Sequence, residues 1–222
     1  MKILVLDVGG THVKCFGNDR KRRCLFKSGK KMTADAMVNT VLELTGGWRY
    51  DAVSIGYPGV VRNGAIAREP HHLARGWIGF DFAAAFDRPV RIINDAAMQA
   101  LGAYKRGHML FLGLGTGLGS ALIVDGVIAA MELGHLRYGK ATDYEDHVGE
   151  RARKRLGGKK WRAKVHDVVR DFRDALLPDD IVLGGGNVHR LKRLPLHTRR
   201  GDNRDAFRRG QRLWEERGRE PT

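Results

Sequence analysis

Apolar residues recur along the chain in short runs that end at glycine-rich turns, and this alternation predicts a series of strands and helices. The first run, Lys2–Leu6, leads into Asp7-Val8-Gly9-Gly10-Thr11, and the chain continues through His12-Val13-Lys14. Apolar runs on both sides of a glycine turn are typical of a β-hairpin. Residues 21–27 are predicted to add a third strand.

A helical pattern follows the first hairpin. Apolar residues recur at helical spacing after Thr33 and stop at Gly46, which predicts the first helix. Two short buried strands are expected at Ala52–Ile55 and Val90–Ile93. The segment Ala96–Tyr104 is expected to be a second helix.

The opening pattern is repeated in the middle of the chain. Met109–Leu112 leads into a turn with four glycines at 113–119, and Ser120–Val124 follows as another apolar run. Such an internal echo predicts a duplicated fold, and strands that alternate with helices place the chain in the α/β class. Further along, the pattern predicts helices at 147–156 and 165–176, a strand at 180–183 before Gly184-Gly185-Gly186, and a final helix at 205–216.

The charge of the chain narrows the choice of partners. Lys and Arg total 40 residues against 25 Asp and Glu, so the formal net charge is +15. Such a field attracts polyanions, whether nucleic acid, an anionic membrane or a phosphate-rich substrate. The basic residues gather at 20–31, 151–164 and 190–212. The alternative interpretation is a solvated surface that keeps the protein soluble.

The lengths of the apolar runs, the first residues and the two cysteines indicate in which compartment the protein works. The longest apolar runs are too short to span a bilayer, and the first residues lack the long apolar core of a signal peptide. Cys15 and Cys24 can form at most one bridge, and free thiols in a reducing cytoplasm are the simpler expectation. We therefore expect a cytoplasmic protein with no membrane partner.

Each of the three glycine-rich turns follows a predicted strand. Backbone N–H groups in such turns can approach phosphate oxygens because no Cβ blocks them. One such turn is weak evidence, since turns need glycine for positive φ, but three at regular places favour phosphate binding. None is a P-loop, and the turn at 113–119 opens a strand, whereas a dinucleotide-binding turn opens a helix.

Acidic residues stand at the ends of predicted strands. Asp7 lies inside the first glycine turn, where Mg²⁺ could bridge its carboxylate to a phosphate; the alternative is an aspartate bonded to its own backbone. Asn94 and Asp95 follow a buried strand and precede a helix, which is typical of a helix cap and also of ligand clefts in α/β proteins. In a cleft, Asp95 could take the proton of a sugar hydroxyl that attacks phosphorus.

Glu132-Leu133-Gly134-His135 follows the second predicted hairpin. The glutamate and the histidine can point the same way and bond vicinal hydroxyls of a sugar. A zinc site would need more ligands, and the chain contains no Cys-x-x-Cys, so no zinc is expected.

Six segments, in this order, resemble the motifs of the ROK kinases, the repressor/ORF/kinase family of bacterial sugar kinases. They are Asp7-Val-Gly-Gly-Thr-His-Val-Lys14, Gly56-Tyr-Pro-Gly-Val-Val61, Ile93-Asn-Asp-Ala-Ala97, Leu114-Gly-Thr-Gly-Leu-Gly-Ser120, Glu132-Leu-Gly-His135 and Ile181-Val-Leu-Gly-Gly-Gly186. The resemblance implies a two-domain actin-like ATPase (ribonuclease H-like) fold with a cleft between the domains. We divide it into a smaller domain at 1–93 and a larger one at 94–222, whose last helix can pack back on the first.

Carried over residue by residue, the resemblance implies roles for the matching positions. Asp95 would be the catalytic base. The residues expected to bind the sugar are Asn94, Gly59, Glu132 and His135. Those expected to face phosphate and Mg²⁺ are Asp7 (also the metal ligand), Gly9, Gly10, Thr11 and Lys14 from one domain, and Gly115, Thr116 and Gly117 from the other. Gly184 and Gly185 would lie under the nucleoside or an equivalent phosphoryl donor.

The chain departs from the usual family pattern after its Gly-His. The family has a cysteine-rich zinc motif there, ending in a glutamate that touches the sugar, and those cysteines are missing here. Glu145 is the expected stand-in for that glutamate, and Glu150 is the other candidate. The zinc-free pattern, together with Gly76-Trp-Ile-Gly79, is similar to polyphosphate glucokinases, and polyphosphate suits the +15 charge.

The resemblance thus implies a hexose kinase that transfers a terminal phosphoryl group from polyphosphate, ATP or both to the 6-hydroxyl of glucose or a related hexose. The alternative is a sugar- or nucleic-acid-binding protein on a kinase scaffold that uses its basic surface. Asp95, Glu132 and His135 argue against it, because a binding protein needs no base. Nucleic acid is therefore disfavoured as a partner, a homodimer is compatible with the family, and the hexose stays open.

Overall fold

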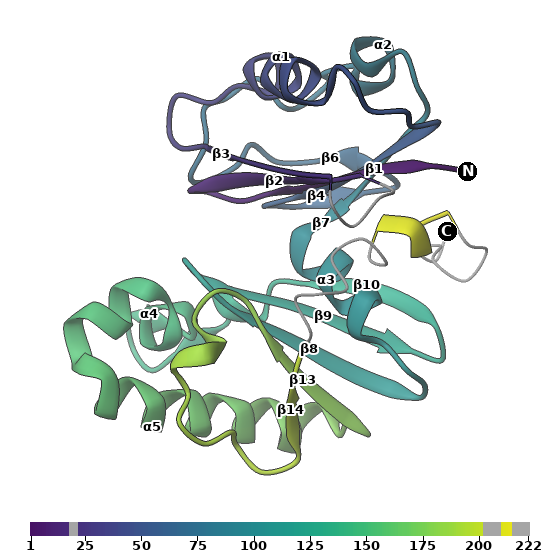
Figure 1. Ribbon diagram of the computed structural model, residues 1–222. Helices are drawn as coiled ribbons and strands as arrows, with labels where there is room; N and C mark the ends of the chain where they lie inside the picture. The colour runs from purple at the N-terminus through teal and green to yellow at the C-terminus, as the bar shows by residue number, and fades with distance from the viewer. Residues whose placement is uncertain (18–21, 202–209, 215–222) are drawn as a thin grey trace.

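The computed structural model describes residues 1–17, 22–201 and 210–214. Two five-stranded sheets face one another with α3 (Asp95–Ala103) between them, and the other long helices lie on the outer sides (Figure 1). We call the first sheet with α1 and α2 the first lobe, and the second sheet with α4 and α5 the second lobe.

The first sheet has the strand order β3-β2-β1-β4-β7. The chain forms three antiparallel strands and then adds two parallel to β1. The elements of the first lobe are β1 (Ile3–Val8), β2 (His12–Phe16), β3 (Arg23–Lys27), α1 (Ala34–Thr45), β4 (Ala52–Tyr57), α2 (Phe82–Phe86) and β7 (Val90–Asn94). Helix α1 begins where its sequence predicts, because the Thr33 hydroxyl accepts the N–H of Ala36 at 3.2 Å.

The second sheet repeats this arrangement. Its order is β10-β9-β8-β13-β14, again three antiparallel strands followed by two parallel ones. The elements of the second lobe are β8 (His108–Leu114), β9 (Leu118–Val124), β10 (Val127–Met131), α4 (Glu145–Val148), α5 (Glu150–Leu176), β13 (Asp180–Gly184) and β14 (Thr198–Arg200). The predicted duplication is confirmed, because both halves pair their strands in the same order and directions.

Several short elements lie outside the two five-stranded sheets. They are the hairpins β5 (Val61–Arg62) with β6 (Ala65–Ile66) and β11 (Arg137–Tyr138) with β12 (Thr142–Asp143), and the 3₁₀ turns η1 (Leu133–His135) and η2 (Val188–Arg190). These hairpins have two-residue strands, too short for a period-two pattern to reveal them in the sequence.

Helix α3 joins the lobes through an apolar core of its own. Residues of both sheets pack around it, including Val5 from β1 and Phe111 from β8. The helix approaches both sheets at glycines: a Cβ on Gly56 would meet the side chain of Met98, and one on Gly119 would lie 2.9 Å from the Cβ of Ala96. Small residues at these two positions therefore let the first turn of α3 lie directly against each sheet.

Two predictions differ from the structure. The helices expected at 147–156 and 165–176 are both present, the first divided between α4 and the start of α5 and the second following a kink inside α5, where the backbone of Gly157 is non-helical (φ 73°, ψ 162°). The second helix begins before residue 165 and includes Trp161, which is fully buried in the core of the second lobe. Cys15 and Cys24 are not free thiols but a disulfide, because β2 and β3 place them directly opposite one another.

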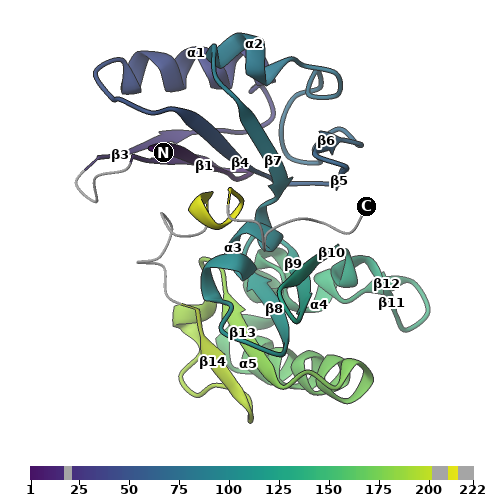
Figure 2. The same ribbon diagram turned by 90° about the vertical axis from the view of Figure 1, so that its right-hand side faces the viewer.

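The described end of the chain returns to the junction of the lobes (Figure 2). Within residues 210–214, Leu213 is buried in the core around α3, and Trp214 donates to the hydroxyl of Ser54 on β4 at 2.9 Å. The rest of the final helix predicted at 205–216 lies outside the described residues. No helix of the described chain is both long enough and apolar enough to cross a membrane.

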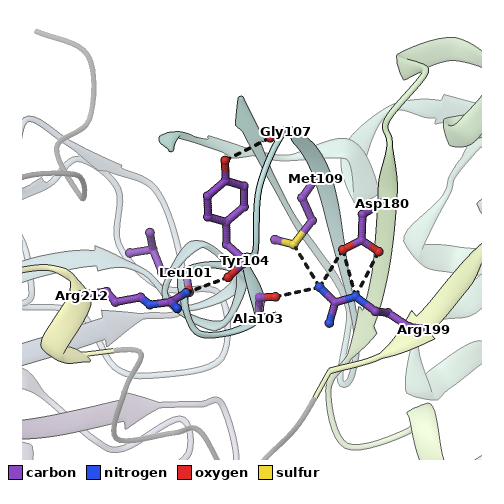
Figure 3. A network of polar contacts seen from close by, with 8 residues as sticks. All are labelled: Leu101, Ala103, Tyr104, Gly107, Met109, Asp180, Arg199 and Arg212. Atoms are coloured by element: carbon purple, nitrogen blue, oxygen red, sulfur yellow. Dashed lines mark hydrogen bonds and ion pairs between the residues drawn. The ribbon is translucent and has the colours of Figure 1, made fainter. Parts of the chain in front are cut away.

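The C-terminal end of α3 is held by two arginines. Arg212 donates to the carbonyls of Leu101 and Tyr104, and Arg199 donates to that of Ala103 at 2.7 Å (Figure 3). Arg199 also forms an ion pair with Asp180 at 2.6 Å. Guanidinium groups at a helix C-terminus satisfy its last carbonyls and complement its dipole.

Candidate active site

Asp95 lies in the first turn of α3, between the two sheets. It is partly buried, and its carboxylate accepts the N–H of Ala96 at 2.8 Å. Burial, together with the charges of Asp7 and Glu132, raises the pKa of this carboxyl to about 7. Burial and two acidic neighbours from other segments of the chain therefore poise Asp95 to exchange a proton near neutral pH.

Asn94 is fixed on both sides. Its amide oxygen caps α3 by accepting the N–H of Ala97 at 3.1 Å, and its amide nitrogen donates to the carbonyl of Gly59 at 3.1 Å. The helix-cap interpretation therefore holds for Asn94, and the same side chain ties the Gly59 loop of the first lobe to the start of α3.

The first glycine turn brings a charged pair to the site. Lys14 of β2 lies opposite Asp7 of β1, and their Nζ and carboxylate are 3.0 Å apart. Gly9 closes the turn by donating to the carbonyl of His12 at 2.9 Å. Thr11 is exposed at its tip.

Gly10 of the same turn is covered by a loop of the first lobe. A Cβ at this position would lie only 2.8 Å from the Cβ of His72, so a larger residue would push the loop away. The close packing of His72 therefore requires a glycine at this position, whether or not a phosphate also approaches it.

The second glycine turn is open at one residue and covered at another. Among the described residues, no atom other than those of its chain neighbours lies within 4 Å of a Cβ built on Gly115, whereas one on Gly117 would collide with the carboxylate of Glu145. The carbonyl of Thr116 accepts the N–H of Glu150 at 3.1 Å, which places the start of α5 against this turn.

The glutamate and histidine of the predicted sugar-binding motif face each other. His135 Nε2 lies 3.6 Å from the carboxylate of Glu132, and its Nδ1 lies 3.5 Å from that of Asp143. Burial raises the pKa of the Glu132 carboxyl, while the neighbouring His135 opposes the rise. Both side chains are about half exposed (47% and 48%), so they can receive a ligand.

Glu145 and Glu150, the two candidates for the third sugar-binding acid, lie on different sides of the second turn. Glu145 accepts the N–H of Leu118 at 3.0 Å, and its charge raises the pKa of Glu132, so it lies on the Glu132 side. Glu150 forms two bonds of 2.6 Å with Arg153 and accepts from Asn187 at 3.0 Å. The bond with Arg153 lowers the pKa of Glu150 to about 2.

The third glycine turn, at the end of β13, packs against the second. Gly185 lies against the backbone of Leu114, and Asn187 donates to the carbonyls of Leu114 at 2.8 Å and Gly115 at 3.2 Å. Gly184 lies against the ring of Phe111. The last two predicted glycine turns thus form one unit, pinned by Asn187.

A metal site made wholly of protein is not found among the described residues, which hold no group of three or more His, Cys, Asp or Glu side chains arranged to bind an ion. The carboxylate of Asp7 fits Mg²⁺ nonetheless, because this ion is usually held by one or two carboxylates together with substrate phosphates and water. Its side chain is 17% exposed and points to the site beside Lys14.

The sequence interpretation missed several residues of this region. His71, His72, Asp143 and Asn187 all contact the predicted residues, as described above for the last three, and His71 lies against His135 with ring centroids 6.0 Å apart. The only signal for the histidines was a His-His pair in a loop before Gly76-Trp-Ile-Gly79. Their place depends on how that loop folds across the lobes.

Comparison with known proteins identifies the family. The ROK family model matches residues 3–148. A polyphosphate glucokinase of Mycobacterium tuberculosis is 30% identical over 204 residues, covering 82% of this chain and 76% of the relative. A glucokinase of Pyrobaculum calidifontis is 31% identical over 146 residues, covering 60% and 49%.

Solved structures share the fold. The inorganic polyphosphate/ATP-glucomannokinase from Arthrobacter sp. strain KM has a TM-score of 0.78 at 23% identity, covering 95% of this chain and 99% of that one. A ROK family glucokinase from Streptomyces griseus, in complex with glucose and AMPPNP, has a TM-score of 0.73 at 17% identity, covering 95% and 98%. The chain therefore belongs to the ROK family and has its two-domain actin-like ATPase fold.

Proposed function

We propose that this protein is a hexose kinase that transfers a terminal phosphoryl group from polyphosphate, ATP or both to the 6-hydroxyl of glucose or a related hexose. Relatives named polyphosphate glucokinase and glucokinase support this activity. The observation that carries it is Asp95: a partly buried carboxyl between the lobes, with its pKa raised to about 7.

Asp95 is the base in this proposal. A carboxylate whose pKa lies near the working pH can both accept the proton of a hydroxyl and release it afterwards. Glu132, His135 and Asn94 would hold the sugar so that the attacking hydroxyl faces Asp95. Holding the two reactants in this geometry supplies much of the rate enhancement in phosphoryl transfer.

The two glycine turns would hold the phosphoryl donor from opposite sides. Lys14 and the backbone of the second glycine turn would supply the positive groups of the site, because Gly115 leaves room there for a phosphate to approach. Asp7 would hold Mg²⁺, which neutralises charge on the donor phosphates when it is bound. Lys14 keeps the carboxylate of Asp7 oriented in its absence.

We assign Glu145 rather than Glu150 to the sugar. Glu145 lies on the side of Glu132, whereas both carboxylate oxygens of Glu150 are occupied by Arg153. We further propose that residues 1–93 and 94–222 act as two domains that close on the sugar and exclude water.

The test is a coupled assay with a panel of hexoses and both donors, on the wild type and on Asp95→Asn. The variant keeps the size of the side chain and removes the base, so its kcat should fall by at least about 100-fold, with glucose binding retained. It should also raise Tm at pH 8, by about 2–4 °C for each kcal/mol gained, because it removes a charge that burial disfavours. Full activity in Asp95→Asn would overturn the assignment of the base.

The alternative, a binding protein without turnover, has its own outcome in the same experiment. It predicts no phosphorylated sugar with either donor, and tighter binding of duplex DNA than of polyphosphate at matched salt. Turnover of a hexose that depends on Asp95 excludes it.

A further inference from the structure

A loop of the first lobe crosses to the sugar-binding residues of the second. It connects β6 to α2 and covers residues 67–81. Its ends belong to the first sheet's side of the molecule, where Tyr57 donates to the carbonyl of Arg68 at 2.8 Å. Its tip carries His71 and His72, which no motif of the sequence assigns to the site.

The loop is held in one shape by its own contacts. The carboxylate of Glu69 accepts the N–H groups of Gly76 at 3.1 Å and Trp77 at 3.2 Å, which closes the loop into a ring. Trp77 is fully buried and packs on the ring of Tyr57, with centroids 5.5 Å apart. A loop fixed in this way presents its tip in a defined position, as a binding residue requires.

The tip lies between the donor turn and the sugar-binding motif. His72 packs on Gly10 of the first glycine turn. His71 is exposed, with its ring 6.0 Å from that of His135, and its charge acts on the carboxyl of Glu132 together with that of Arg68. His71 thus belongs to the first lobe but faces the acceptor residues of the second.

We infer that His71 is a further sugar-binding residue, supplied by the first lobe opposite Glu132 and His135; this inference rests on the proposed hexose kinase activity. An imidazole can donate a hydrogen bond to a hydroxyl or accept one. The centroids of the His71 and His135 rings are 6.0 Å apart, near enough for both side chains to reach hydroxyls of one hexose. A hexose hydroxyl bound there would bridge the lobes.

The inferred contact would make sugar binding depend on both lobes at once. Glu132 and His135 alone would hold the sugar to the second lobe, with the first lobe free to move. A hydroxyl shared with His71 adds a bond that exists only when the lobes are together. The bound sugar would therefore favour the closed arrangement in which the donor turn meets it.

The experiment measures KM for the hexose and for the donor separately in His71→Ala. Loss of one hydrogen bond to a bound hydroxyl should raise the hexose KM about tenfold, with donor KM and Tm unchanged. His71→Asn keeps a donor and an acceptor and should recover part of the loss. His108→Ala removes another exposed histidine, at the far end of β8, and should change neither KM.

A deoxyglucose series identifies the hydroxyl. Removing the hydroxyl that His71 binds should raise KM less in His71→Ala than in the wild type, a coupling that removal of the other hydroxyls should lack. An unchanged hexose KM in His71→Ala, or an equal rise in donor KM, would overturn the inference. So would equal penalties for every deoxy sugar in both proteins.

Failure of the inference can be distinguished from failure of the proposed function. If the wild type phosphorylated no hexose, the proposed function would fall. Glucose binding measured by calorimetry in the wild type and in His71→Ala would then still decide the inference, since it requires binding and no turnover.

Discussion

The two lobes have the same strand order but carry different chemistry at equivalent positions. In the first hairpin, Asp7 pairs with Lys14 across β1 and β2 and lies beside Gly56 of the parallel strand. In the second hairpin, Gly113 has the same place, paired with Gly119 and beside Gly184. A charged pair in one lobe is therefore replaced by two glycines in the other.

This difference shows how a duplicated fold can divide one task. The first lobe brings its charges on the strands of the hairpin itself, where they can meet a phosphate or a cation. The second lobe leaves its hairpin uncharged and packs it closely against α3 at Gly119. Its acids come instead from segments that follow the hairpin, such as Glu132 and Glu145.

The largest effect that would sharpen this comparison is expected from Asp7→Asn. Loss of the Asp7 charge, which is expected to face the donor phosphates and the cation, should lower kcat by about 100-fold with either donor.

The dependence of activity on pH gives a second measurement of the same variant. Asp95 acts as a base in its ionised form, so activity should rise with pH through about 7. Because the charge of Asp7 raises that pKa, its removal should move the rise to lower pH.

Lys14→Met is the matched control for this change. It breaks the same ion pair but keeps the negative charge of Asp7. Donor use should weaken, and the rise in the pH profile should not move to lower pH. An unchanged profile in Asp7→Asn would mean that the two carboxyls do not interact.

An intermediate effect is expected from the two glutamates beside the second turn. Glu145→Gln should raise the hexose KM about tenfold, because it lies on the side of Glu132. Glu150→Gln should act on the donor KM instead, because it releases Arg153 and Asn187 next to Gly115. Separate KM values for hexose and donor in each variant check the assignment, and the reverse pattern would give Glu150 to the sugar.

The smallest effect is expected from the basic surface of α5. Reversing the charges of Lys159, Lys160 and Arg162 should weaken the use of polyphosphate by several-fold, and that of ATP less, since only a long polyanion would reach from the second glycine turn to the part of α5 beyond its kink. The ratio of kcat/KM for the two donors, measured at two salt concentrations, checks this.

A matched control for the α5 variant reverses exposed charges elsewhere. Arg49, Lys105 and Arg106 are exposed and belong to other segments of the chain. Their reversal should leave the ratio between the donors unchanged. An equal loss with both donors in the α5 variant would count against a polyphosphate path along this helix.

Much of the fold could be predicted because its strands and turns follow from local sequence patterns. Apolar runs marked the central strands of both sheets, and glycine turns marked their ends, since these features depend on neighbours in sequence. The start of the helix after the kink in α5 could not be predicted in the same way. Gly157-Gly158 indicates the break, and the structure has a kink at Gly157. That the second helix begins before residue 165 depends on the burial of Trp161 in the core of the second lobe, which the local pattern does not show.

The site was predicted in its motifs but not in its contacts. Asp95, Glu132 and Glu145 were found from their segments, and the structure brings their charges within reach of one another. His71 was missed, because its loop is placed by Glu69 and Trp77 and its neighbour His135 lies 64 positions further along the chain. No spacing rule connects such a pair.

The sequence by itself determined the duplicated α/β plan, the three glycine turns and the position of Asp95 at the start of a helix, because each follows from local backbone preference and apolar period. The tertiary structure alone decided which charges meet. It paired Cys15 with Cys24, bonded Glu145 to Leu118 but Glu150 to Arg153, and placed the ring of His71 near that of His135. The physical reason is that a pKa or a hydrogen bond depends on distance in space, and packing around α3 sets those distances.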